Sequence, residues 1–239
     1  GASAEPGGKA RLEARLPGRG DQLRAIDYLT GLIREHRVDY QGGRLVDAEA
    51  VLALEPDAVV LATGSTLRAP ALEPGSEPMT GLREAAAELV SKVGSRSGTA
   101  VLFDQDHTAP VYAAAELLAE RFDKAVLITP RVQIARSVPY VSGIGVYRRL
   151  YRAGVEIVLA AAPVSRQGGR FTYRNVFTGE TGTIDGVTLA CYATPRIADG
   201  ALAEPLRQAG IEVHLVGDCY APRSPLAAVH EGHRVGSGL

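Results

Sequence analysis

The sequence has no tryptophan, a single methionine and only two cysteines among its 239 residues. Cys191 and Cys219 lie far apart and form no CxxC pair, which argues against a disulfide framework and favours a reducing compartment. No run of about 18 apolar residues is present, and the N-terminal stretch lacks the apolar centre of a signal peptide. We therefore expect a cytoplasmic protein that makes no membrane contact.

Strong charge of either sign is also missing. The 26 Lys and Arg residues nearly balance the 27 Asp and Glu residues, giving a formal net charge of -1. Without a basic surface field or a long basic run, nucleic acid is not expected as a partner. Hydrophobic residues make up 46% of the chain, which is enough for one large or two small α/β domains.

The order of apolar and helical segments predicts the fold class. Residues 1–20, rich in glycine, are expected to form a loop, and residues 58–62 a buried parallel strand. A strand at 100–103, a helix at about 109–121 and a strand at 124–129 follow. Residues 170–176 and 183–190 favour a hairpin around Thr178-Gly179-Glu180. We predict an α/β protein with two Rossmann-like, doubly wound domains, the second inserted in the first. Their predicted limits are 1–75 with 193–239, and 76–192.

Two of the predicted strands end in residues suited to a nucleotide. Thr63-Gly64 follows the strand at 58–62, and a glycine there lets the backbone turn sharply or approach a ligand. Gly217-Asp218 joins a strand to a helix, so its carboxylate can meet ribose or ribityl hydroxyls while helix amides face a phosphate. Asp218 can equally be a helix cap, and Thr63-Gly64 an ordinary turn.

The first glycine pair is a further candidate. Gly7-Gly8 lets the backbone pass close to a pyrophosphate or flavin, and Lys9 adds positive charge. An ordinary loop is the competing interpretation.

Four segments in order carry a family resemblance: Glu5-Pro6-Gly7-Gly8, the run from Val59 to Gly64, the inserted strand, helix and strand, and Gly217-Asp218. They resemble the paired dinucleotide-binding domains of pyridine nucleotide:disulfide reductases. Within that group, Leu16-Pro17-Gly18 and the continuation to Ala221-Pro222-Arg223 are most similar to the trimethylamine dehydrogenase and 2,4-dienoyl-CoA reductase family, including N-demethylases.

The resemblance implies cofactors and partners. It implies FAD or ADP bound by this part of the protein, with cofactor contacts from the residues named above and from Arg223. It also implies an N-terminal barrel that holds FMN and, in many members, an iron–sulfur cluster. The expected partners are that barrel and an electron-transfer flavoprotein, and a homo-oligomer stays open. Gly1 falls where the family has the acidic residue that holds a ribose hydroxyl, so the chain is expected to be truncated within its first domain.

The inserted unit departs from the family pattern. The turn expected to bind a nicotinamide dinucleotide should be rich in glycine, but residues 104–110 read Asp-Gln-Asp-His-Thr-Ala-Pro. We expect Asp104 and Asp106 to repel a pyrophosphate and the side chains to fill its space, so NAD(P)H binding is not expected.

No metal site and no catalytic residue are predicted. His230 and His233 are three apart, whereas zinc proteases need His-Glu-x-x-His. Two functions remain: a nucleotide-binding part of a flavin-dependent oxidoreductase, acting on an amine or an enone, or a cofactor-free module for folding, oligomerisation or docking of an electron acceptor.

Overall fold

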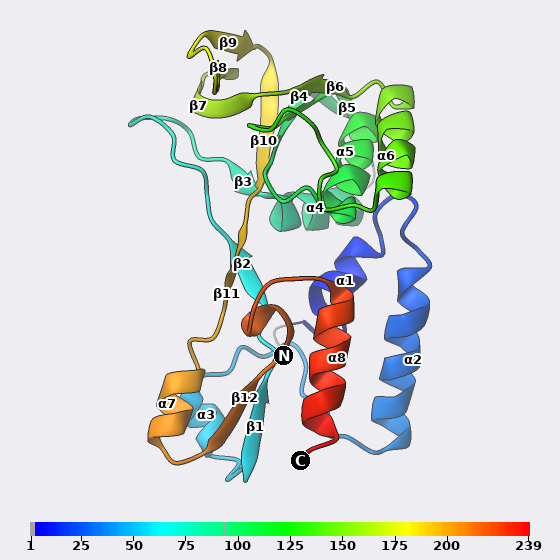
Figure 1. Cartoon of the computed structure of the whole chain (residues 1–239), viewed down its shortest axis with the longest axis vertical. Coiled ribbons are helices and arrows are strands. Elements are labelled where there is room, and N and C mark those ends of the chain that lie inside the picture. Colours follow the sequence, from blue (N-terminus) through cyan, green and yellow to red (C-terminus); the bar gives the residue numbers. More distant parts are fainter. Residues whose placement is uncertain (1–2, 93) are drawn as a thin grey trace. The chain divides into compact units, whose positions relative to one another are not determined.

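The computed structural model describes residues 3–92 and 94–239 and divides the chain into two compact units. The first contains the residues up to Gly8, Thr30–Arg68 and Arg196–Leu239, and the second contains Lys9–Leu29 and Ala69–Pro195. Figure 1 shows the order of the elements along the chain. In sequence, most of the second unit lies between two parts of the first. The helix α2 (Gln22–Glu35) contains one of the boundaries.

The second unit is built on a parallel sheet of five strands in the order β3-β10-β4-β5-β6. The strands are β3 (Thr80–Gly81), β10 (Val187–Ala193), β4 (Arg96–Asp104), β5 (Phe122–Ile128) and β6 (Glu156–Val158). Three helices share a core with this sheet: α4 (Leu82–Ser91), α5 (Ala109–Arg121) and α6 (Tyr140–Arg152). The central strands are continuous apolar runs because both of their faces are covered.

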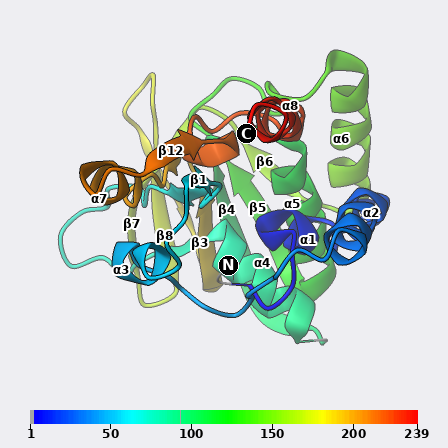
Figure 2. The same ribbon diagram turned by 90° about the horizontal axis from the view of Figure 1, so that it is seen from below.

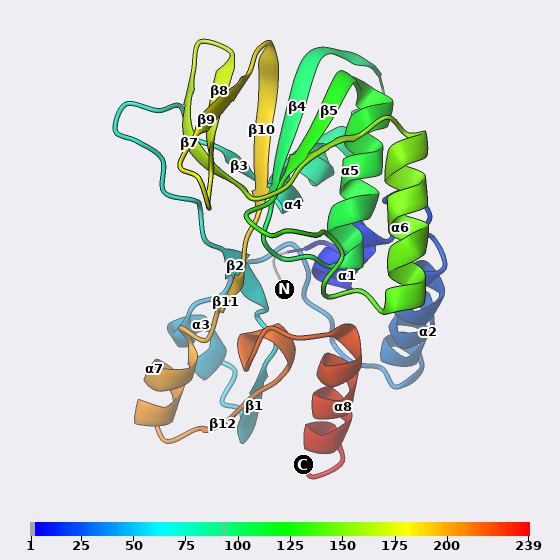
Figure 3. The ribbon, with the colours of Figure 1, turned by 45° about the horizontal axis from the view of Figure 1, so that its top comes forward.

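The alternation of side chains along β4 shows the layers. Ala100 and Leu102 join the core formed with α4, α5 and α6, whereas Val101 and Phe103 join a core on the other face. That second core includes Phe171 and belongs to an antiparallel sheet of β7 (Ala161–Gln167), β8 (Arg170–Asn175) and β9 (Thr181–Ile184). Figure 3 shows this layer beside β10 and β4, with α5 and α6 beyond the parallel strands. The unit is thus a three-layer α/β structure.

The first unit contains two short pairs of strands. The strands β1 (Ala58–Leu61) and β12 (Glu212–Leu215) pair in parallel, and they lie side by side in Figure 2. The strands β2 (Ser65–Leu67) and β11 (Arg196–Ala198) pair antiparallel. A small core gathers Leu61, Leu206 and Cys219 with α3 (Ala48–Leu52) and α7 (Ala203–Gln208). The 3-10 turn η1 (Gly217–Cys219) follows β12, and α8 (Pro225–Gly236) comes after it.

The α/β class and the Rossmann-like parallel sheet are confirmed. The helix predicted at 109–121 is α5, and the strand predicted at 58–62 is β1. One local prediction is wrong. Residues 8–13 form a helix, α1 (Gly8–Glu13), because Lys, Ala, Arg, Leu and Glu all favour helix despite the glycines around them.

The predicted hairpin around Thr178-Gly179-Glu180 is present, but its second strand is shorter than predicted. The partner of β8 is β9, which ends at Ile184, and the next strand, β10, belongs to the parallel sheet. Gly186, with φ +69°, separates the two strands. One alternating stretch of sequence therefore contains two strands in two different sheets.

Candidate functional site

The ends of β1 and β12 meet at one edge of the first unit. Leu61 pairs with Leu215 in parallel register, and the Val216 amide donates to the Leu61 carbonyl over 3.0 Å. Because parallel strands end at the same edge, Gly64 and Gly217 follow them there. Gly64 has φ +88° and Gly217 has φ +64°, both in the left-handed region that favours glycine. These are the two strand ends to which the sequence assigned a nucleotide.

Asp218 is the centre of this edge. Its Oδ2 accepts hydrogen bonds from Ser65 Oγ at 2.9 Å and from Arg196 Nη1 at 2.8 Å. The Arg223 amide lies 3.4 Å from Oδ1. The side chains of Asp218 and Arg196 are only 10% and 15% exposed. The carboxylate is therefore oriented by a charged donor and a hydroxyl in a largely buried setting, where ion pairs are stronger than at the surface.

Thr63, an exposed residue, lies at the same edge. Its hydroxyl donates to the Asp199 carbonyl and lies 3.1 Å from the Cys219 sulfur. Cys219 Sγ also contacts the Asp199 carbonyl at 3.1 Å, and the Asp199 amide donates to the Gly64 carbonyl at 3.0 Å. These bonds fix the turn after β1 against the turn after β12. Thr63 thereby shapes the site.

Arg223 is held beside the carboxylate. Its guanidinium forms an ion pair with Glu231 and lies 5.8 Å from the centre of the Tyr220 ring. The other oxygen of Glu231, Oε2, accepts from the Gly217 amide at 2.7 Å. Half of the Arg223 side chain, 49%, is exposed. It is thus a fixed cation that a ligand can reach at the rim of the site.

The glycine pair of the N-terminal segment is placed differently. Gly7 and Gly8 have φ +106° and +46°, and Gly8 begins α1. Lys9 belongs to the second unit. Gly7 and Gly8 belong to the first unit, as Asp218 does. The prediction for Gly1 lies outside the described residues.

Three residues of the site were not predicted as ligand-site residues: Ser65, Arg196 and Glu231. Ser65 directly follows Thr63-Gly64, so extending the candidate site by one residue would have included it. Glu231 lies between the two histidines that fail the zinc pattern, and it acts as an acceptor for the Gly217 amide. Arg196 has no local sequence signal, because only the pairing of β11 with β2 brings it to Asp218.

The corresponding edge of the second unit is closed by its own side chains. Asp104, at the end of β4, is fully buried, and its Oδ1 accepts from the amides of Asp106 and His107. Tyr112 donates to Asp104 Oδ2 at 2.8 Å and accepts from the Ala135 amide at 2.6 Å. His107 is also buried, with Nδ1 3.3 Å from the Tyr112 hydroxyl. This network corrects one expectation: Asp104 points into the protein and cannot repel a pyrophosphate directly.

A segment after β5 covers the same turn. The Ser137 amide donates to the His107 carbonyl at 3.2 Å, and Ser137 Oγ donates to the Asp106 carbonyl at 3.2 Å. Within the segment, Ile134 is only 2% exposed and belongs to the helical core. The segment after β5 thus covers the turn at residues 104–110 on this side.

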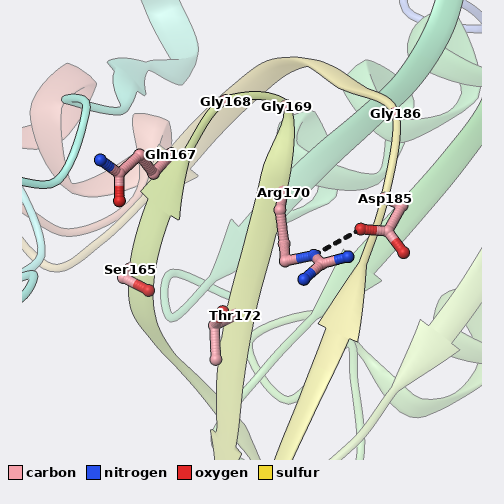
Figure 4. Close-up of a pocket in the computed structure, with 8 residues that line it drawn as sticks. All are labelled: Ser165, Gln167, Gly168, Gly169, Arg170, Thr172, Asp185 and Gly186. Atoms are coloured by element: carbon pink, nitrogen blue, oxygen red, sulfur yellow. Dashed lines mark hydrogen bonds and ion pairs between the residues drawn. The ribbon is translucent and has the colours of Figure 1, made fainter.

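A hollow lies elsewhere in the second unit. It is an open depression of about 670 Å³ on the β7-β8-β9 sheet, shown in Figure 4. Its lining is polar and includes the exposed Arg170–Asp185 ion pair of 2.7 Å. Enclosing walls and convergent buried groups, which mark a ligand site, are not features of this surface. Among the described residues, no cluster of three or more His, Cys, Asp or Glu could hold a metal ion. Nor is any described helix long and apolar enough to cross a membrane.

Comparison with known proteins shows what the chain is similar to. No family model matches the chain. Bilirubin reductase of Mediterraneibacter gnavus is 25% identical over 228 residues, which are 95% of this chain and 34% of that protein. NADH oxidase of Thermoanaerobacter brockii is 26% identical over 242 residues, 96% of this chain and 35% of that protein. The solved structure of histamine dehydrogenase from Rhizobium sp. 4-9 is 24% identical, with a TM-score of 0.81, over 100% of this chain and 39% of that one.

The resemblance to the trimethylamine dehydrogenase and 2,4-dienoyl-CoA reductase family is confirmed. The relatives in this family are flavin-dependent oxidoreductases. They support a cofactor of the flavin or nicotinamide type. The chain spans about a third of the length of the curated relatives it matches.

The residues at the edge of the first unit fit a nucleotide of this family. A hydroxyl of a ribose or ribityl group would donate to Asp218, and the cation of Arg223 would suit a phosphate. A Cβ added to Gly64 would meet nothing within 4 Å, so the backbone there faces open space. Gly217 differs, because an added Cβ would lie 3.3 Å from Ala228 Cβ, and its glycine is explained by the turn and by packing against α8.

Proposed function

We propose that this chain is the C-terminal nucleotide-binding part of a flavin-dependent oxidoreductase, and that its first unit binds FAD or an ADP moiety. The observation that supports this most directly is the convergence of Ser65, Arg196 and the Arg223 amide on the Asp218 carboxylate. An acceptor held this firmly, at the edge where α/β sheets bind nucleotides, is preorganised for a ribose or ribityl hydroxyl.

The chemistry of the whole protein belongs to this proposal as well. The reacting centre would be an FMN in a preceding barrel, with an amine or an enone as substrate and an iron–sulfur cluster where the family has one. A bound flavin supplies electron transfer, while the residues of this chain bind and orient the nucleotide. We assign no catalytic residue to the described part of the chain.

The residues named at the first glycine pair take a secondary place in this proposal. Gly7 and Gly8 would allow the backbone to approach the nucleotide, and Lys9 would add charge. Thr63 and Gly64 would shape the turn, and Gly217 would place Asp218.

Replacement of Asp218 by Ala tests the proposal. Loss of a hydrogen bond to a charged group is typically worth about 1.5–3 kcal/mol. We therefore expect Asp218→Ala to weaken FAD or ADP binding by roughly 10- to 150-fold in calorimetric titration. Asp57→Ala is the matched control, because Asp57 is exposed and precedes β1 at its opposite end. Unchanged affinity in a folded Asp218→Ala protein would show that Asp218 is only a turn residue.

A second function, docking of an electron acceptor, is supported by the outer face of α6. Tyr140 and Val141 are 83% and 80% exposed, and Ile144 and Tyr151 share that face by helical spacing. Two exposed arginines, Arg148 and Arg152, also lie on this face, and none of its residues is acidic. Aromatic side chains with arginine are typical of interface centres. The occupant that fits is an electron-acceptor protein with an apolar patch bordered by carboxylates.

Charge reversal distinguishes this second function. We expect Arg148→Glu with Arg152→Glu to slow the association of an electron-transfer flavoprotein at least tenfold at low salt, and less at high salt. Arg174→Glu, an exposed change on β8, should leave the rate unaltered. Equal rates for both variants would remove α6 as the docking face. Nucleotide affinity should be unchanged in all of them.

A further inference from the structure

Two short strands carry the chain between its units. The chain leaves the first unit after β2 and returns to it at Arg196, the first residue of β11. The strands pair antiparallel, with Arg196 opposite Leu67 and Ala198 opposite Ser65. Figures 1 and 3 show them side by side. A change in this pairing therefore affects the chain at two of the four points where it passes between the units.

The same two strands hold the carboxylate of the nucleotide site. Ser65 comes from β2 and Arg196 from β11, and both donate to one oxygen, Oδ2, of Asp218. Arg196 also reaches further, because its Nη2 donates to the Arg223 carbonyl at 2.8 Å. One guanidinium therefore ties β11 to both ends of the turn from Asp218 to Arg223. A planar guanidinium with several donors can make both bonds at once, which a single ammonium does less well.

We propose that Arg196 is a positioning residue of the nucleotide site and that it makes the linking strands respond to nucleotide binding. This inference rests on the proposed function, since it requires a nucleotide at Asp218. The ion pair holds the carboxylate in the orientation that a ligand hydroxyl needs, so a bound nucleotide favours the state in which the pair is formed. Thermodynamic linkage is reciprocal: if the ion pair raises the affinity for nucleotide, bound nucleotide stabilises the ion pair by the same free energy. The pairing of β2 with β11 should tighten accordingly.

Hydrogen exchange with and without ADP tests the inference. In the unaltered protein, we expect ADP to slow exchange of the amides in β2 and β11 by at least fivefold. Arg196→Gln should weaken ADP binding at least tenfold and abolish that slowing. Arg196→Lys keeps the positive charge but loses the planar guanidinium with its several donors. We therefore expect an intermediate ADP affinity and a partial slowing of hydrogen exchange. Arg207→Gln is the matched control, because Arg207 lies in α7 of the same unit and contacts the Val213 carbonyl.

The outcomes separate the two proposals. If Asp218→Ala loses ADP affinity while Arg196→Gln keeps it, Asp218 binds nucleotide and the role of Arg196 is overturned. If Arg196→Lys matches the unaltered protein in ADP affinity and in hydrogen exchange, the inference is also overturned. If Arg196→Gln does not fold, the Arg196→Lys variant alone decides the outcome. If neither ADP nor FAD binds the unaltered protein, the proposed function itself fails. A general structural effect of Arg196 would accelerate exchange without making it dependent on ADP.

Discussion

The hydroxyl of Tyr112 lies 2.8 Å from Oδ2 of Asp104, and both side chains are completely enclosed by protein. The same hydroxyl accepts from the Ala135 amide at 2.6 Å. A residue of α5 thus connects the end of β4 to the segment that follows β5. This side chain thus helps to close the turn of the second unit.

Tyr112→Phe should open that turn. The change removes a donor from a buried carboxylate and leaves the Ala135 amide unsatisfied, which together should cost about 2–4 kcal/mol of unfolding free energy. Urea denaturation measures the loss, and hydrogen exchange should accelerate most at the Ala135 amide. Tyr151→Phe, on the exposed face of α6, is the control and should be neutral. Equal stability of the two variants would contradict the proposed closure.

Asp104 gives the second unit a pH dependence. Burial raises the pKa of its carboxyl above the ordinary value of 3.8, although the neighbouring His107 acts in the opposite direction. In the window between 3.8 and the raised value, the unfolded chain loses its proton first, so stability falls as the pH rises through it. The stabilising contribution is fully present below 3.8 and absent above the raised pKa.

Asp104→Asn tests this sign, because the amide does not titrate. Urea unfolding from pH 3.5 upward should show the unaltered protein losing stability relative to Asp104→Asn by about 1.4 kcal/mol for each unit of pKa difference. Parallel curves for the two proteins would show that the carboxyl titrates alike in folded and unfolded chains.

Gly64 and Gly217 should respond differently to alanine. Both have positive φ, so each change should cost about 1–2 kcal/mol of backbone strain. Gly217→Ala adds a contact of 3.3 Å with Ala228 Cβ, and a further loss of about 1 kcal/mol is expected. Gly31→Ala within α2, where an added Cβ meets nothing, should instead stabilise by about 0.5–1 kcal/mol. Thermal unfolding gives the order, and a Gly217→Ala protein no less stable than Gly64→Ala would contradict it.

On the proposed function, nicotinamide nucleotides should reduce the bound flavin poorly. The turn at residues 104–110 has no glycine, and the segment containing Ile134 and Ser137 is hydrogen-bonded across it. A pyrophosphate must approach backbone amides closely in order to bind, and this packing prevents that approach. Stopped-flow mixing of the full-length flavoprotein with NADH and NADPH measures the rate. Rapid bleaching of the flavin at micromolar nucleotide would overturn this prediction.

The sequence was informative where one segment decides the structure by itself. The apolar run at 100–103 and the helix at 109–121 needed only local patterns, since residue type alone indicates a buried parallel strand and a helix rich in alanine and leucine. Gly217-Asp218 was found for the same reason. The domain limits and the binding roles of the site residues stay predictions.

Contacts between residues far apart in the sequence could not be predicted from local patterns. Arg196 reaches Asp218 only because β11 pairs with β2. The Asp104 side chain points inward because Tyr112 and two backbone amides donate hydrogen bonds to it there. The split between β9 and β10 likewise depends on two sheets competing for one stretch of sequence. Such choices are made by tertiary structure, which overrides local preference.

The parallel pair of β1 and β12 also dictates an order of events during synthesis. Ala58 leaves the ribosome long before its partner Glu212 has been made. All five strands of the sheet that contains β4, by contrast, are complete once Ala193 has been added. Since domains generally fold as units while the chain emerges, the second unit can fold first and the first unit must wait for the last residues to be translated.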